Sequence, residues 1–130
     1  MPGGRGARKL ALEALYEHDV AKRPAAEVLA RHPAGPARSY AERLVAGVQE
    51  HGADIDAQIG AVAEDWTLER MPLIDRNALR IGVLELVYLG VPAGIAIGEA
   101  VELAKQYSTA DSGRFVNGVL SRIDRDRAGV

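Results

Sequence analysis

Basic side chains gather at the start of a predicted helix, where they could hold phosphate groups. Arg5, Arg8 and Lys9 open a segment whose apolar residues recur at steps of three and four, which is typical of a helix with one buried face. Arg5 and Arg8 lie about one helical turn apart, so we expect their guanidinium groups to project together. Guanidinium pairs well with phosphate, and positive charge at a helix start disfavours the helix itself. An ordinary solvated helix start explains the same residues, and both interpretations stay open.

Two aromatic side chains are candidates for stacking on unpaired bases. Phe115, the only phenylalanine, falls in the last predicted helix, and Tyr16 falls near the inner end of the first. Proteins that bind single-stranded RNA stack bases on such rings, although core packing explains both residues equally well. Asp111 and Ser112 precede the last helix and are expected to cap it. A carboxylate there could also accept hydrogen bonds from base amino groups.

Residue types that support catalysis or metal binding lack the necessary spacing. The chain has no cysteine, which excludes disulfides and thiolate chemistry. The three histidines, His18, His32 and His51, show no metal-ligand spacing, and no serine lies in a nucleophile-elbow motif. Neighbouring carboxylates are more typical of helix caps and solvated surface than of acid–base pairs. We therefore expect no enzymatic activity, no metal and no cofactor.

Charge is unevenly distributed along the 130 residues, whose formal net charge is −2. Residues 1–50 carry eight Lys or Arg and six Asp or Glu, residues 51–110 carry four and nine, and residues 111–130 carry four and three. A polyanion would therefore favour the two ends of the chain. No apolar run is long enough to span a membrane, and the N-terminus lacks a signal-peptide segment. These features, with the absence of cysteine, predict a cytoplasmic protein without a membrane partner.

Helices alone must position these residues, because apolar spacing is helical along nearly the whole chain. Breaks rich in proline or glycine separate seven predicted helices. The first two span residues 5–21 and 24–31, the third carries Tyr40 to Val48, and the fourth is capped by Asp54 and carries Ile55 to Val62. The fifth is capped by Asp75 and runs to Tyr88, the sixth carries Ile97 to Ala104, and the seventh carries Phe115 to Ile123. The fifth is apolar on nearly all sides, which indicates a central helix. The sequence predicts an all-α, compact bundle of about seven helices, forming one domain over residues 1–130 with a flexible tail at residues 1–4.

Six segments follow one another along nearly the whole chain, and the last three join helix and turn signals at fixed distances. They are ARKLALEALYEHD, YAERLVAGVQEH, IDAQI, WTLERMPLIDRNALRIGVLEL, VPAGIAIGEAVELAKQY and DSGRFVNGVL. Together they resemble the NusB family of transcription antitermination factors. The resemblance implies an all-helical, non-catalytic adaptor that pairs with a NusE-type small-subunit ribosomal protein. Such an adaptor binds boxA-type single-stranded RNA of nascent ribosomal transcripts and acts with the transcription elongation complex.

The resemblance also implies one RNA-facing surface built from three parts of the chain. These are the basic helix start with the tyrosine that follows it, the start of the central helix, and the last turn with its helix. The residues concerned are Arg5, Arg8, Lys9 and Tyr16, then Asp75, Arg76 and Arg80, and finally Asp111, Arg114 and Phe115. Arginines would hold phosphates, Phe115 or Tyr16 would stack on a base, and the carboxylates would accept hydrogen bonds from bases.

The chain departs from the family pattern at two places. Gly4 and Gly6 dilute the usually arginine-rich opening, which predicts weaker RNA binding and a shallower salt dependence. An aromatic residue, a lysine and an asparagine of the family are absent from residues 91–100, where Gly98 is expected to loosen the helix. Two alternatives stay open. One is a homodimeric or protein-binding scaffold with weak RNA affinity. The other is a detached N-terminal RNA-binding domain of a ribosomal RNA methyltransferase, which the lack of a following α/β pattern disfavours.

Overall fold

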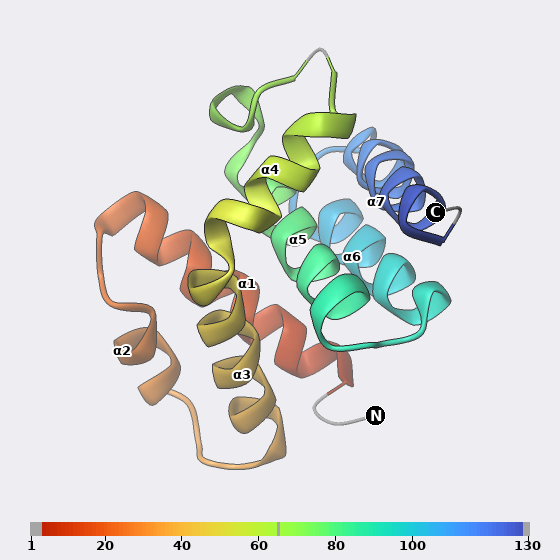
Figure 1. Cartoon of the computed structure of the whole chain (residues 1–130). Helices are drawn as coiled ribbons and strands as arrows, with labels where there is room; N and C mark the ends of the chain where they lie inside the picture. The colour runs from red at the N-terminus through yellow and green to blue at the C-terminus, as the bar shows by residue number, and fades with distance from the viewer. Residues whose placement is uncertain (1–3, 65, 129–130) are drawn as a thin grey trace.

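The computed structural model describes residues 4–64 and 66–128, and every regular element among them is helical (Figure 1). The elements are α1 (Gly4–Ala21), α2 (Ala25–Ala30), α3 (Pro36–Glu50), α4 (Gly52–Val62), a 3-10 turn η1 (Leu68–Arg70), α5 (Leu73–Val83), a π-helical turn η2 (Leu84–Tyr88), α6 (Ala93–Tyr107) and α7 (Ser112–Ala128). The expected all-helical bundle of about seven helices is confirmed. Of the expected tail, residues 1–3 lie outside the described residues, and Gly4 is the first residue of α1.

Two expected helix caps are wrong. α4 begins at Gly52 after His51, and α5 begins at Leu73 after Pro72, so that Asp54 and Asp75 lie inside the first turns. Neither N-cap residue makes a side-chain capping hydrogen bond. Proline before α5 presets the backbone angle of the helix start, which places the boundary earlier than the nearest capping side chain suggests.

α5 is the centre of the bundle, as its apolar sequence predicted. It packs against α1, α4, α6 and α7, and Figure 1 shows it between the α1–α3 group and the other helices. Its side chains Ala78, Leu79 and Val83 are fully buried. A Cβ at Gly82 would lie 2.6 Å from Leu120 of α7, so glycine permits this close approach of helices.

The central helix ends in a π-helical turn rather than continuing as an α-helix. The Leu89 N–H donates to the Leu84 carbonyl at 3.0 Å, which is the wider i to i+5 pattern. Leu84, Glu85 and Leu86 of this turn are buried. Glu85 is therefore a charged side chain inside an otherwise apolar turn.

A buried ion pair joins α1, α3 and η2. Arg8 and Glu85 have side chains that are 2% and 1% exposed, and the Arg8 Nε donates to the Glu85 carboxylate at 2.8 Å. The Tyr40 hydroxyl of α3 donates to the other carboxylate oxygen. The Arg8 guanidinium also lies 5.8 Å from the centre of the Tyr40 ring. An unpaired buried charge is strongly destabilising, so these three side chains stabilise the fold only as a set, which we call the Glu85 network.

The Glu85 network makes Tyr40 resistant to ionisation. Burial, then the hydrogen bond to Glu85 and its negative charge, raises the pKa of Tyr40 to about 12. Because the folded-state pKa lies above the usual 10.0, this contribution to stability is complete below pH 10 and is lost between pH 10 and about 12. We expect one of the four tyrosines to titrate late in an absorbance titration of the native protein.

The Tyr40→Phe variant is the matched control for this titration. It should lack the late phase, and its urea-unfolding free energy should fall less steeply than that of the wild type between pH 10 and 12. Ionisation of all four tyrosines together near pH 10 in the native wild type would contradict the assignment.

Candidate nucleic-acid interface

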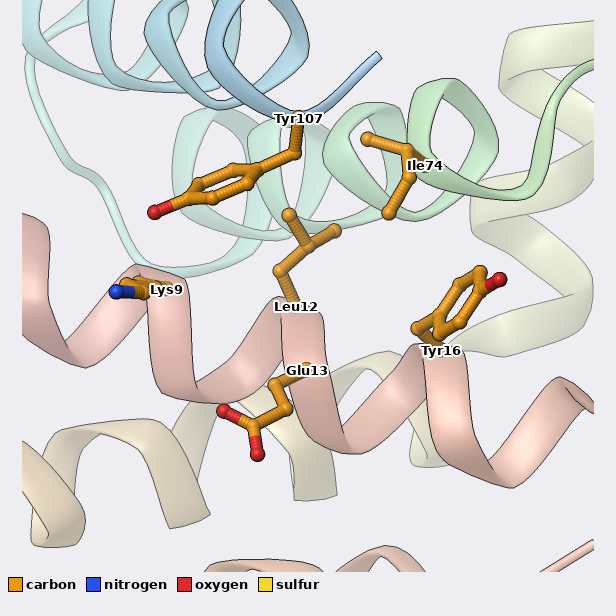
Figure 2. Close-up of a pocket in the computed structure, with 6 residues that line it drawn as sticks. All are labelled: Lys9, Leu12, Glu13, Tyr16, Ile74 and Tyr107. Carbon is orange, nitrogen blue, oxygen red and sulfur yellow. The ribbon is translucent and has the colours of Figure 1, made fainter. Parts of the chain in front are cut away.

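A groove between α1, the start of α5 and the end of α6 contains two of the predicted RNA-binding residues. We call it the tyrosine groove, and it is lined by Lys9, Leu12, Glu13, Tyr16, Ile74 and Tyr107. The first four follow one another at helical steps, so one face of α1 supplies them all. Figure 2 shows Tyr107 reaching from α6 toward Lys9 and Leu12, with Ile74 of α5 on the same side of α1.

The tyrosine groove combines an aromatic, an apolar and a cationic group within reach of one ligand. Tyr16 is 39% exposed, and the Lys9 ammonium lies 5.8 Å from the centre of the Tyr107 ring. Leu12 is buried beneath them, and Glu13 adds a half-exposed carboxylate at the margin. The Glu13 carboxylate points away from Tyr107 and Ile74 (Figure 2) and lies 3.7 Å from the His32 ring nitrogen. The other side chains can stack a base and hold its phosphate. Sequence reasoning missed Tyr107, although a tyrosine that ends a helix beside a polar turn was the available signal.

Arg5 and Arg8 both reach Glu99 of α6, but the expectation that both face a partner is wrong for Arg8, which is 1% exposed. Arg8 belongs to the Glu85 network in the core. Arg5 stays 62% exposed at its side chain and donates to both oxygens of Glu99, at 3.0 and 3.2 Å. The physical reason is the buried carboxylate of Glu85, which takes the nearest arginine of α1 as its counter-ion. The signal for this was a lone glutamate between leucines in the fifth predicted helix.

Glu99 of α6 neutralises part of the positive charge at the start of α1. The hydrogen bond from Arg5, together with its charge, lowers the pKa of Glu99, and the same contacts raise the pKa of Arg5. The Arg8 Nη1 also lies 3.8 Å from the Glu99 carboxylate. A phosphate that binds Arg5 must therefore compete with Glu99.

Of the three predicted residues on α5, Arg80 in the last turn is engaged in ion pairs inside the protein. Arg80 donates to both oxygens of Asp56 on α4, at 2.8 and 2.9 Å, and lies 3.6 Å from Asp19 on α1. Asp75 is 3% exposed, so the expectation that its carboxylate contacts RNA at the surface is wrong in this conformation. Arg76 is half-buried. Arg80 thus connects three helices, and its guanidinium group is already paired with the carboxylates of Asp56 and Asp19.

The turn between α6 and α7 presents the last group of predicted residues. Asp111 is exposed, and its backbone carbonyl accepts a hydrogen bond from the Phe115 N–H at 3.1 Å. Among the described residues its carboxylate makes no capping bond, whereas the Ser112 hydroxyl accepts from the Thr109 N–H at 3.2 Å. Arg114 is exposed and Phe115 is half-buried.

Phe115 packs against a residue that sequence reasoning did not select. The ring centres of Phe115 and Trp66 lie 5.5 Å apart at an angle of 47°, and Trp66 is 45% exposed. Both rings line a groove between the end of α4 and α7, together with Arg114. A lone tryptophan in a connecting turn was the signal available in the sequence.

The structure therefore separates the predicted residues into two sets. Arg5, Lys9, Tyr16, Asp111 and Arg114 reach the surface, with Phe115 half-buried beside them. Arg8, Asp75 and Arg80 are buried or held in ion pairs, and Arg76 is half-buried. In the part of the chain that the structure describes, no helix is long and apolar enough to cross a membrane. Over the same residues, no three metal-ligating side chains gather.

Known proteins resemble this chain in both sequence and fold. Residues 5–125 match the model of the NusB family. A relative from Salinispora arenicola, "Transcription antitermination protein NusB", is 48% identical over 95% of this chain and 96% of its own length. NusB of T. maritima superposes with a TM-score of 0.88 at 33% identity, covering 97% of this chain and 92% of that one. A chain in the structure "Crystal Structure of Antitermination Factors NusB and NusE in complex with dsRNA" superposes with a TM-score of 0.83 at 32% identity, covering 94% and 96%.

Substitutions in the Glu85 network test whether Arg8 acts in the fold. Arg8→Met leaves Glu85 without a counter-ion and should lower the free energy of unfolding by about 3–5 kcal/mol. Glu85→Gln leaves Arg8 with only the more distant Glu99, at 3.8 Å, and should lower it by somewhat less. The double variant contains neither charge of this pair. Its free energy of unfolding should therefore fall by clearly less than the sum of the two single-variant decreases. Urea unfolding of the four proteins measures this coupling. Losses that add to within about 0.5 kcal/mol would show that the two side chains act independently.

Proposed function

This chain belongs to the NusB family, and we propose that it is an RNA-binding adaptor in transcription antitermination. It binds boxA-type single-stranded RNA of nascent ribosomal transcripts together with a NusE-type small-subunit ribosomal protein, as part of the elongation complex. Family membership over nearly the whole chain supports the role, and the solved complex of NusB and NusE with double-stranded RNA supports RNA and a NusE-type protein as the two partners. The observation in this chain that carries the RNA-binding role is the tyrosine groove beside an exposed Arg5.

The tyrosine groove favours unpaired bases over a duplex. Tyr16 and Tyr107 offer ring faces, and the faces of bases are accessible for stacking only where they are not paired and stacked in a helix. Lys9 and Arg5 follow one another by about one turn along α1, so they would hold successive phosphates.

The proposed role is that of an adaptor, not of an enzyme. The groove supplies cations and aromatic rings, which bind and orient RNA without a nucleophile beside a base. The half-exposed Tyr16 above an apolar floor also suits a second copy of this chain, which would cover the same groove. Self-association would then compete with RNA, and sedimentation of the protein with and without RNA distinguishes the two.

Substitutions in the tyrosine groove should weaken RNA binding without harming the fold. Tyr16→Ala removes a stacking ring and should weaken binding of a boxA-type RNA by about five- to a hundredfold. At low salt, Lys9→Glu should also weaken RNA binding. Because this variant loses one phosphate contact, the slope of log affinity against log salt concentration should become shallower by about 0.7. Fluorescence anisotropy with labelled RNA, with and without the NusE-type protein and at two salt concentrations, measures both effects.

Arg43→Glu is the matched control for Lys9→Glu, because it makes the same charge change at an exposed site on α3. It should retain wild-type affinity when the partner is present. Equal RNA affinity of the Lys9→Glu, Tyr16→Ala and Arg43→Glu variants would show that the tyrosine groove is not part of the RNA interface.

Glu99→Gln should strengthen RNA binding. The substitution removes the negative charge that holds Arg5 and competes with phosphate. Because exposed ion pairs are weak, the expected gain is modest, about two- to fivefold at low salt. The same anisotropy measurement detects it, and an Arg5→Ala/Glu99→Gln double variant should show no gain. Unchanged or weaker binding by Glu99→Gln would mean that Arg5 does not hold phosphate.

A further inference from the structure

A second groove of the molecule combines an exposed aromatic ring with a row of arginines. We call it the tryptophan groove; it lies between the end of α4 and α7, and its polar and aromatic lining includes Trp66, Arg114, Phe115, Arg122 and Arg125. Trp66 keeps 45% of its surface exposed while packing on Phe115. Most large apolar side chains of this fold are buried, so this indole ring presents an unusual face to solvent.

The three arginines lie along one face of α7. Positions 114, 122 and 125 are separated by eight and three residues, which returns them to the same side of an α-helix over a length of about 16 Å. All three are exposed. Arg122 pairs with Asp126 at 3.2 Å across one turn. Among the described residues, no carboxylate lies within ion-pair distance of Arg114 or Arg125. Glu64 also lines the groove, so among the described lining residues the arginines exceed the acidic side chains.

The tryptophan groove continues the surface on which RNA is proposed to bind. Tyr107 ends α6 and lines the tyrosine groove, whereas Arg114 and Phe115 begin α7 and line the tryptophan groove. Residues 108–111 join the two helices, and α6 and α7 pack against each other. The two grooves therefore take lining residues from opposite ends of one connection in the chain, which contains the exposed Asp111.

We propose that the tryptophan groove is a second RNA subsite, which takes unpaired nucleotides that flank the boxA-type element. Trp66 stacks on a base, and Arg114, Arg122 and Arg125 hold the phosphates beside it. This inference rests on the proposed function. A polyanion with exposed ring faces fits the combination of indole and guanidinium groups better than an acidic peptide does, because every nucleotide carries a ring beside its phosphate, whereas a peptide offers a ring only at an aromatic side chain.

The single tryptophan of the chain makes the subsite directly observable. The full chain, with a NusE-type partner whose tryptophans are replaced by phenylalanine, is titrated with three RNAs. One is the boxA-type element alone, and the other two are the same element extended by six uridines at its 5′ end or at its 3′ end. One extended RNA should bind about five- to a hundredfold more tightly than the element alone. It should quench the Trp66 fluorescence, whereas the element alone should leave it nearly unchanged.

Variants separate this subsite from general electrostatic attraction. Trp66→Leu and Arg125→Glu should each abolish the gain from the extension, and Trp66→Phe should keep part of it because a ring remains. Arg127→Glu is the matched control: it makes the same charge change on the same helix, but Arg127 pairs with Asp124 and lines a different groove. It should keep the gain.

Three outcomes would overturn the inference. Equal affinity for the short and both extended RNAs, without quenching, would refute the second subsite and leave the proposed function intact. Quenching of Trp66 by the partner alone would make the groove a protein interface. Failure of every RNA to bind, with the partner present and at low salt, would refute the proposed function together with the subsite.

Discussion

The buried carboxylate of Glu85 imposes a constraint on which the arrangement of the helices depends. Its side chain is 1% exposed, and an ionised carboxylate in such a place requires a counter-ion and hydrogen-bond donors. Arg8 supplies the charge from α1, and Tyr40 supplies a hydroxyl from α3. Both must reach the π-helical turn at the end of the central helix. One side chain thereby limits how the first and third helices can lie against α5, since hydrogen bonds are directional and apolar contacts are not.

This constraint also determines which basic residues of α1 face outward. Consecutive helical residues point about 100° apart, so an inward Arg8 places Lys9 on a neighbouring face, in line with Tyr16. That face forms one wall of the tyrosine groove. Arg5 remains outside, where Glu99 of α6 holds it. The positive charge available to RNA is therefore smaller than the basic residues of the helix start suggest, which is consistent with an adaptor that relies on a protein partner.

Two grooves with aromatic rings and cations take lining residues from opposite ends of the connection between α6 and α7. Their cations come from the two ends of the chain, α1 and α7, where the sequence has its excess of positive charge. α6 packs against both α1 and α7. This shared neighbour brings the two basic ends of the chain to one helix. The acidic middle of the chain supplies part of its charge to interior pairs, such as Glu85 with Arg8 and Asp56 with Arg80.

The helical fold, the breaks between helices and the central place of α5 could all be predicted from the order of residues. These features depend on apolar periodicity and on proline and glycine, which act over a few residues. The tertiary structure alone decided which charges are inside. Arg5 and Arg8 look alike in sequence, and their fates differ because Arg8 meets a carboxylate 77 residues away. Trp66 likewise became a site candidate only beside Phe115. Burial of a charge and exposure of a ring depend on partners distant in the chain, which local spacing does not encode.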